Sequence, residues 1–154
     1  MYRTILFVHS LLRWLVLISG AWNLLAGLAG VASKRPYVKA DRVAGLAFMI
    51  TIDVQFLLGL ALYVALSPLT TLTIFPHFGA AMKDRVLRFW AVEHVTLMVL
   101  ALTAAHVGNV LVKRASDPLL KHRRSFLWTL LALILLGAGI PWQILPYGRA
   151  LFPW

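Results

Sequence analysis

Long apolar runs separated by short basic clusters organise this sequence of 154 residues. A helix needs about 20 mainly apolar residues to cross a bilayer. Four segments meet this requirement, at approximately 5–31, 43–66, 86–112 and 126–147. The first is too long for the core of a signal peptide. The pattern therefore predicts an all-α fold, an integral membrane four-helix bundle in which residues 1–154 form a single domain.

The composition favours a membrane protein over a soluble domain. Hydrophobic residues make up 61% of the chain and charged residues 13%, whereas a soluble domain carries about a quarter charged residues. The mean hydropathy is +0.84, so we expect the lipid bilayer to surround the bundle. The chain has no cysteine, which excludes disulfides, iron–sulfur ligation, thiolate nucleophiles and covalently attached c-type haem.

The distribution of basic residues predicts the orientation of the helices. Nine Lys and Arg residues lie in or beside the connections 32–42 and 113–124, and five lie at the opposite helix ends: Arg3, Lys83, Arg85, Arg88 and Arg149. By the positive-inside rule the two richer connections face the cytoplasm. Both termini then lie on the outer, periplasmic side of a bacterial inner membrane. All the Lys and Arg residues except Arg13 lie in these short clusters between apolar runs, so we expect no nucleic-acid partner.

Ionisable side chains at membrane depth are costly and are therefore candidates for function. The predicted spans contain His9, Arg13, Asp53, Glu93 and His94, and His106 lies nearer the cytoplasmic end. At 1.5 Å per residue, His9 lies about 6 to 9 Å into the first helix and His94 about 12 Å into the third, so the two imidazoles can meet. Arg13 and Asp53 both fall near the midplane, where we expect them to form an ion pair.

Two imidazoles at equal depth on facing helices are what a b-type haem requires for axial ligation. Arg85 and Arg88, about two turns from His94, would suit the anionic propionates. The alternative is that His9 and His94 form hydrogen bonds to neighbours inside the bundle.

His106 is a weaker haem-binding candidate. It is rotated by roughly 120° from His94 on the same helix, and its only partner for a second haem would be His122, which the pattern places as a surface histidine in a basic connection. Met98 faces the same way as His94 and is expected to pack. No nucleophile–base pair, phosphate loop or dinucleotide fingerprint is present, so no catalytic residue is predicted.

Several segments resemble a family of small bacterial four-helix membrane proteins known as cytochrome b-like. They are HSLLRW (9–14), AMKDRVLRFWAVEHVTLM (81–98), His106 and IPW (140–142), which together extend over nearly the whole chain. The resemblance implies haem b and transmembrane electron transfer. It also implies a histidine two residues before Gln55, where this chain has Asp53. One ligand of such proteins is therefore absent here, or its site is used for an ion pair with Arg13.

Two hypotheses for function follow. The first is a haem-b electron carrier, with His9 and His94 as axial ligands, that exchanges electrons with a quinone or a membrane oxidoreductase and is a component rather than a stand-alone enzyme. The second is a haem-free accessory subunit of a larger respiratory or photosynthetic membrane complex. Proton or ion transfer along the buried polar residues is a third reading, for which four helices leave little room. The first hypothesis requires both histidines, whereas a scaffold would tolerate other polar residues there.

Overall fold

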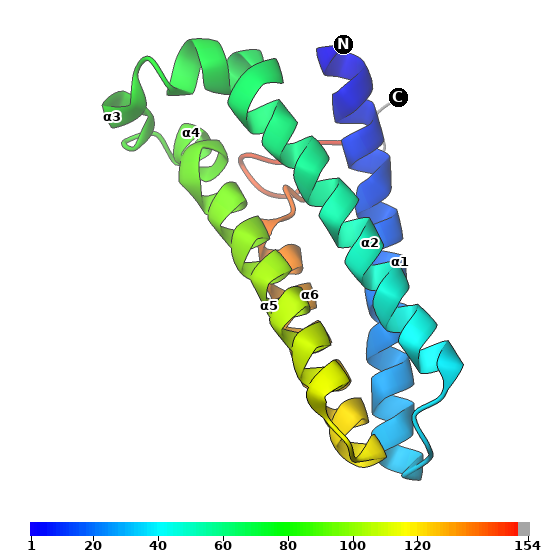
Figure 1. Ribbon diagram of the computed structural model, residues 1–154. Helices are drawn as coiled ribbons and strands as arrows, with labels where there is room; N and C mark the ends of the chain where they lie inside the picture. The colour runs from blue at the N-terminus through cyan, green and yellow to red at the C-terminus, as the bar shows by residue number, and fades with distance from the viewer. Residues whose placement is uncertain (151–154) are drawn as a thin grey trace.

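The computed structural model describes residues 1–150, and this range is helical with no strand. Four long helices form its body: α1 (Tyr2–Ser33), α2 (Lys39–Ala61), α5 (His94–Arg114) and α6 (Pro118–Gly139) (Figure 1). The N-terminus and residues 140–150 lie at one end of the molecule, which we call the pocket end. The connections 34–38 and 115–117 lie at the other, which we call the basic end.

Acidic residues define where several helices begin. Asp41 accepts a hydrogen bond from the backbone N–H of Val38 (2.9 Å), Asp84 from Leu87 (2.8 Å) and Asp117 from Leu120 (2.7 Å). Such side chains satisfy N–H groups that the first helical turn leaves without partners. Three of the five acidic residues in the chain are thus committed to helix starts, which leaves Asp53 and Glu93 for other contacts.

π-helical turns continue α2 and precede α5 at the pocket end. Segment η1 (Leu62–Leu66) extends α2, and the chain returns through η2 (Leu69–Ile74), α3 (Phe78–Ala81), α4 (Arg85–Arg88) and η3 (Phe89–Glu93) into α5. The hydroxyl of Tyr63 in η1 donates to the carbonyl of Ala91 in η3 at 2.6 Å. This bond joins the two π-helical turns across the pocket end. Short π-helical turns are frequent at functional sites.

Three helices are long and apolar enough to cross a membrane: Tyr2–Ser33, Lys39–Leu66 and Arg85–Arg114. They correspond to the first three predicted spans. The fourth predicted span, 126–147, is displaced in the structure, because α6 begins at Pro118 after the Asp117 cap and ends at Gly139, before Pro141. The early start brings the basic residues of the 121–124 stretch into the first two turns of α6. His122, which the pattern placed as a surface histidine, lies within α6 and is fully buried.

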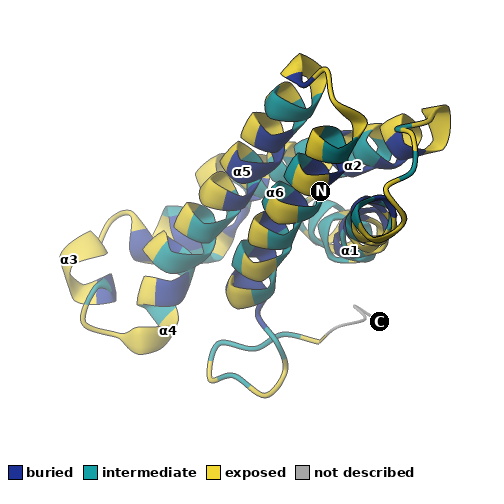
Figure 2. Ribbon diagram, turned by 90° about the horizontal axis from the view of Figure 1, so that it is seen from below, coloured by how far each residue is buried: buried dark blue, intermediate teal, exposed yellow. Residues whose placement is uncertain are grey.

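Packing among the long helices is uneven. α1 packs along both α2 and α6, and α5 packs along α6, whereas α2 and α5 touch at few places. The core lies between the helices and is rich in alanine: Val16, Phe48, Met49, Ile52, Ala101, Ala104, Ala105, Ala132 and Leu136. Figure 2 shows exposed residues along the outward sides of the long helices, and many of them are large and apolar. An apolar exterior around a partly polar interior is the arrangement that a bilayer favours.

Candidate functional site

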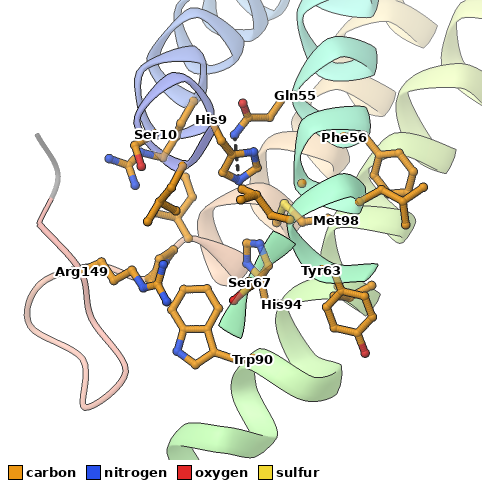
Figure 3. Close-up of a pocket in the computed structure, with 18 of the residues that line it drawn as sticks. His9, Ser10, Gln55, Phe56, Tyr63, Ser67, Trp90, His94, Met98 and Arg149 are labelled. Atoms are coloured by element: carbon orange, nitrogen blue, oxygen red, sulfur yellow. Dashed lines mark hydrogen bonds between the residues drawn. The ribbon is translucent and has the colours of Figure 1, made fainter. Parts of the chain in front are cut away.

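A cavity of about 140 Å³ lies at the pocket end, between α1, α2, α5 and α6 (Figure 3). His9 and Arg13 enter it from α1, Gln55 from α2, and His94 from the start of α5. Ser67, Leu69 and Thr70 of the η1–η2 region line it, as do Pro141 and Arg149 of the C-terminal segment. The start of the connection after α2 therefore supplies part of the cavity wall.

His94 is held by a backbone carbonyl. Its Nδ1 lies 2.7 Å from the carbonyl oxygen of Gly139. Because a carbonyl oxygen can only accept, Nδ1 carries the proton, and Nε2 then presents its lone pair. Figure 3 shows the His94 ring pointing into the cavity. Orientation of one imidazole nitrogen by a carbonyl, with the other left for a ligand, is the usual arrangement of metal-binding histidines.

His9 faces the same cavity with fewer partners. Its Nε2 lies 3.4 Å from the side-chain nitrogen of Gln55, and its Nδ1 is buried without a hydrogen-bond partner. The side-chain oxygen of Gln55 is also buried without a partner. A buried polar atom that makes no hydrogen bond costs about 1–3 kcal/mol. The pair therefore has hydrogen-bonding or coordinating capacity that the chain itself leaves unused.

Gly59 on α2 leaves room for the His9 ring. A Cβ atom at this position would lie 3.0 Å from Cε1 of His9, closer than ordinary van der Waals contact. The His9 imidazole therefore packs directly against the backbone of α2 at Gly59. Any larger residue at position 59 would push His9 toward the middle of the cavity.

Aromatic and basic side chains from η3 and from the segment after α6 form the remaining part of the cavity wall. The guanidinium of Arg149 lies 4.1 Å above the centre of the Trp90 ring, and both residues line the cavity. Tyr147 stacks on Phe89 with ring centres 3.6 Å apart. These contacts fasten the segment after α6 onto η3, and they bring a positive charge to the mouth of the cavity. Arg13 supplies a second positive charge from α1.

The structure changes the expected positions of Arg85 and Arg88. Neither residue lines the cavity. Arg88 donates from Nε to Glu93 at 2.8 Å, and both side chains are more than 40% exposed. The η3 turn between Arg88 and His94 rotates these arginines away from the cavity. The cationic groups at the cavity are instead Arg149 and Arg13.

The expected Arg13–Asp53 pair is not formed, because Asp53 faces α5 rather than α1. Its carboxylate lies 2.8 Å from Nε2 of His106. Neither Asp53 nor His106 lines the cavity. Residues 53 and 55 are rotated by about 200° on a helix, so Gln55 points into the cavity while Asp53 points toward α5. His106 is therefore not brought to His94 or His9.

Sequence reasoning missed several cavity residues. Arg149 follows the proline-rich end of α6, and no helical period fixes its place. Gln55 carries a signal in the sequence, because an amide side chain at membrane depth needs a polar partner. Met98, expected to pack, does line the cavity, and its Cε lies close to Gly139.

Comparison of the chain with family models, with curated proteins and with solved structures finds no match. Within residues 1–150 there is also no group of three or more His, Cys, Asp or Glu side chains placed to hold a metal ion.

The cavity carries side chains of the kinds that would hold a b-type haem. Two imidazoles and two guanidinium groups line one space, together with Phe56, Tyr63 and Trp90. The free volume of about 140 Å³ resembles that of an engineered cavity that holds a benzene ring. A macrocycle thus requires the lining side chains to turn aside, and the sparse contacts between α2 and α5 leave the cavity room to widen on that side.

Proposed function

We propose that this protein is a membrane electron carrier that binds one b-type haem between α1 and α5, with His9 and His94 as the axial ligands. The observation that carries the proposal is that both imidazoles line one cavity while the Gly139 carbonyl fixes His94. A bound b-type haem supplies one-electron transfer. Arg149 and Arg13 would hold its carboxylates, and the aromatic side chains would keep water away from its ring.

The proposed topology has four spans. α6 has 22 residues, and its exposed Leu127, Leu131 and Ile134 supply a lipid-facing surface above its basic first turns. Nine basic residues at the basic end against five at the pocket end favour a cytoplasmic basic end. Both termini and the cavity would then lie near the periplasmic side of a bacterial inner membrane.

A reduced-minus-oxidised visible spectrum of the detergent-purified protein tests this proposal. We expect a sharp b-type band in the parent, made by cells with sufficient haem, and its loss in both His9→Ala and His94→Ala. His77→Ala is the matched control, because His77 is an exposed residue outside the cavity, and it should retain the band. A folded but colourless parent would overturn the proposal and favour the haem-free accessory subunit.

A further inference from the structure

The pair formed by Asp53 and His106 joins α2 and α5 where these helices otherwise touch little. Nε2 of His106 lies 2.8 Å from Oδ1 of Asp53, and the two side chains are 50% and 43% exposed. Exposed apolar residues share the helix faces of the pair: Leu57 on α2, and Val99 and Val110 on α5. The pair therefore faces the surroundings of the helices, with Asp53 in the middle of its candidate span and His106 eight residues before the end of its own, Arg85–Arg114.

Polar groups of this kind are costly against hydrocarbon. Ionisable residues inside a membrane almost always face the bundle interior or a water-filled cavity. Asp53 accepts no hydrogen bond at a helix start. It is also the one acidic residue of the five in the chain that lies more than ten residues from either end of a candidate span. A molecule that reaches this pair comes from the lipid phase, and it must offer a hydrogen-bonding group to His106.

The pair lies next to the cavity. Phe56, one turn after Asp53 on α2, lines the cavity, and so does Met98 on α5. Met98 precedes His106 by eight residues, which corresponds to about 12 Å along the helix. α2 and α5 make few contacts with each other, so a flat ring seated on the pair would lie beside the part of the cavity that Phe56 and Met98 line.

We propose that Asp53 and His106 form the binding site of a lipid-soluble quinol that donates electrons to the cavity. This inference rests on the proposed haem-binding function. The carboxylate of Asp53 accepts the Nε2 proton of His106, so that Nδ1 of His106 is left to accept a hydrogen bond from a quinol hydroxyl. The apolar side chains around the pair would hold the ring and its tail.

The oxidation balances with His106 as the proton acceptor. The quinol loses two electrons and two protons in two one-electron steps and becomes a quinone. A haem held in the neighbouring cavity would take up one electron in each step, so two turnovers of the carrier would consume one quinol. In each step Nδ1 of His106 takes one proton, and Asp53 stabilises the resulting imidazolium before that proton passes to water.

The first test measures haem reduction by decylubiquinol in the parent and in Asp53→Asn and His106→Gln. A positioned general base contributes about 10²–10⁴-fold to a rate, so we expect the initial rate to fall at least about 100-fold in both variants. The band produced by dithionite should remain at parental intensity. Thr103→Val is the matched control, because Thr103 lies on the same exposed face of α5 and its hydroxyl only bonds the Val99 carbonyl; it should keep the parental rate.

The second test does not depend on haem. Quenching of tryptophan fluorescence by decylubiquinone measures binding to the protein, and we expect saturable quenching in the parent that is lost in both variants. Parental quenching and parental quinol rates in the variants would overturn the inference. So would a change in oligomeric mass in detergent with quenching intact, which would make this face a contact between protein chains. If the parent is colourless but its saturable quenching is lost in the variants, the quinone site stands and the haem proposal fails.

Discussion

The two halves of this bundle differ in what surrounds their buried polar groups. Toward the basic end Asn23 links α1 to α6, because it donates to Thr129 at 2.7 Å and accepts from Ser125 at 3.1 Å. The ring nitrogens of the buried His122 in this half have no hydrogen-bond partner, but the ring is packed against Gly30 and does not line the cavity. Toward the pocket end, His9 and Gln55 keep buried atoms without partners around a cavity. A satisfied network fixes helix packing, whereas unsatisfied groups around a cavity provide the capacity to bind a ligand.

Small residues sharpen the same contrast. On the half of α1 toward the basic end, Gly27 lets the backbone of α6 approach, since a Cβ there would lie 2.9 Å from the backbone nitrogen of Phe126. At the pocket end, Gly59 leaves room for the His9 side chain. Glycine thus closes the interface in one half and spares the cavity in the other.

The largest effect on stability should come from Gly30→Ala at the basic end. A Cβ at this position would overlap the ring of the fully buried His122. Such overpacking typically costs about 1–3 kcal/mol of unfolding free energy. The visible spectrum of the haem proposed for the cavity should not change. Thermal unfolding in detergent measures the loss. Gly137→Ala is the control, because a Cβ there meets nothing within 4 Å, and equal losses in the two variants would contradict the tight packing.

A smaller effect is expected from Asn23→Ala, which removes two interhelical hydrogen bonds. Interhelical hydrogen bonds in membrane proteins average about 0.6 kcal/mol each, so the free energy of unfolding should fall by about 1 kcal/mol. Reversible unfolding in SDS checks this value. Ser33→Ala is the control, since the Ser33 hydroxyl bonds only to the carbonyl of Ala29 in its own helix at 2.7 Å. A loss no larger than that of Ser33→Ala would show that the network does not hold α1 on α6.

The smallest effect on stability is expected from Arg88→Gln at the pocket end. The exposed Arg88–Glu93 pair is of a kind that contributes about 0–1 kcal/mol. Arg88 lies outside the cavity, so haem content should also stay parental. Arg149→Gln, which removes a guanidinium from the cavity wall, should lower the haem content at similar stability. Pyridine haemochrome analysis compares the two variants, and a larger loss of haem in Arg88→Gln would restore the arginine placement expected from sequence.

Sequence patterns predicted the features of this fold that depend on position along a helix. Apolar run length predicted four spans, of which the first three correspond to helices that are long and apolar enough to cross a membrane. The rise per residue predicted that His9 and His94 could meet, and both line one cavity. Rotation about each helix axis is set by packing, and no single-helix pattern contains it. The predicted ion pair between Asp53 and Arg13 is therefore wrong, and Asp53 faces His106.

The start of α6 carried a readable signal. Asp117 followed by Pro118 is a helix cap with a proline in the first turn. This pattern predicts a helix that begins at Pro118 and therefore contains His122. The basic residues that follow concealed it, because they interrupt the apolar run that defines a span. Arg149 could not have been placed, because it follows Pro141 and Pro146 in a segment without a regular period.

The most direct test of the central claim, that His94 and His9 ligate a haem iron, is chemical rescue of His94→Gly by imidazole. The account predicts that the variant loses the sharp reduced band and that added imidazole, entering the space left by the side chain, restores it. His9→Gly should respond in the same way, and His77→Gly should need no rescue. A full parental band in His94→Gly without imidazole would contradict the assignment.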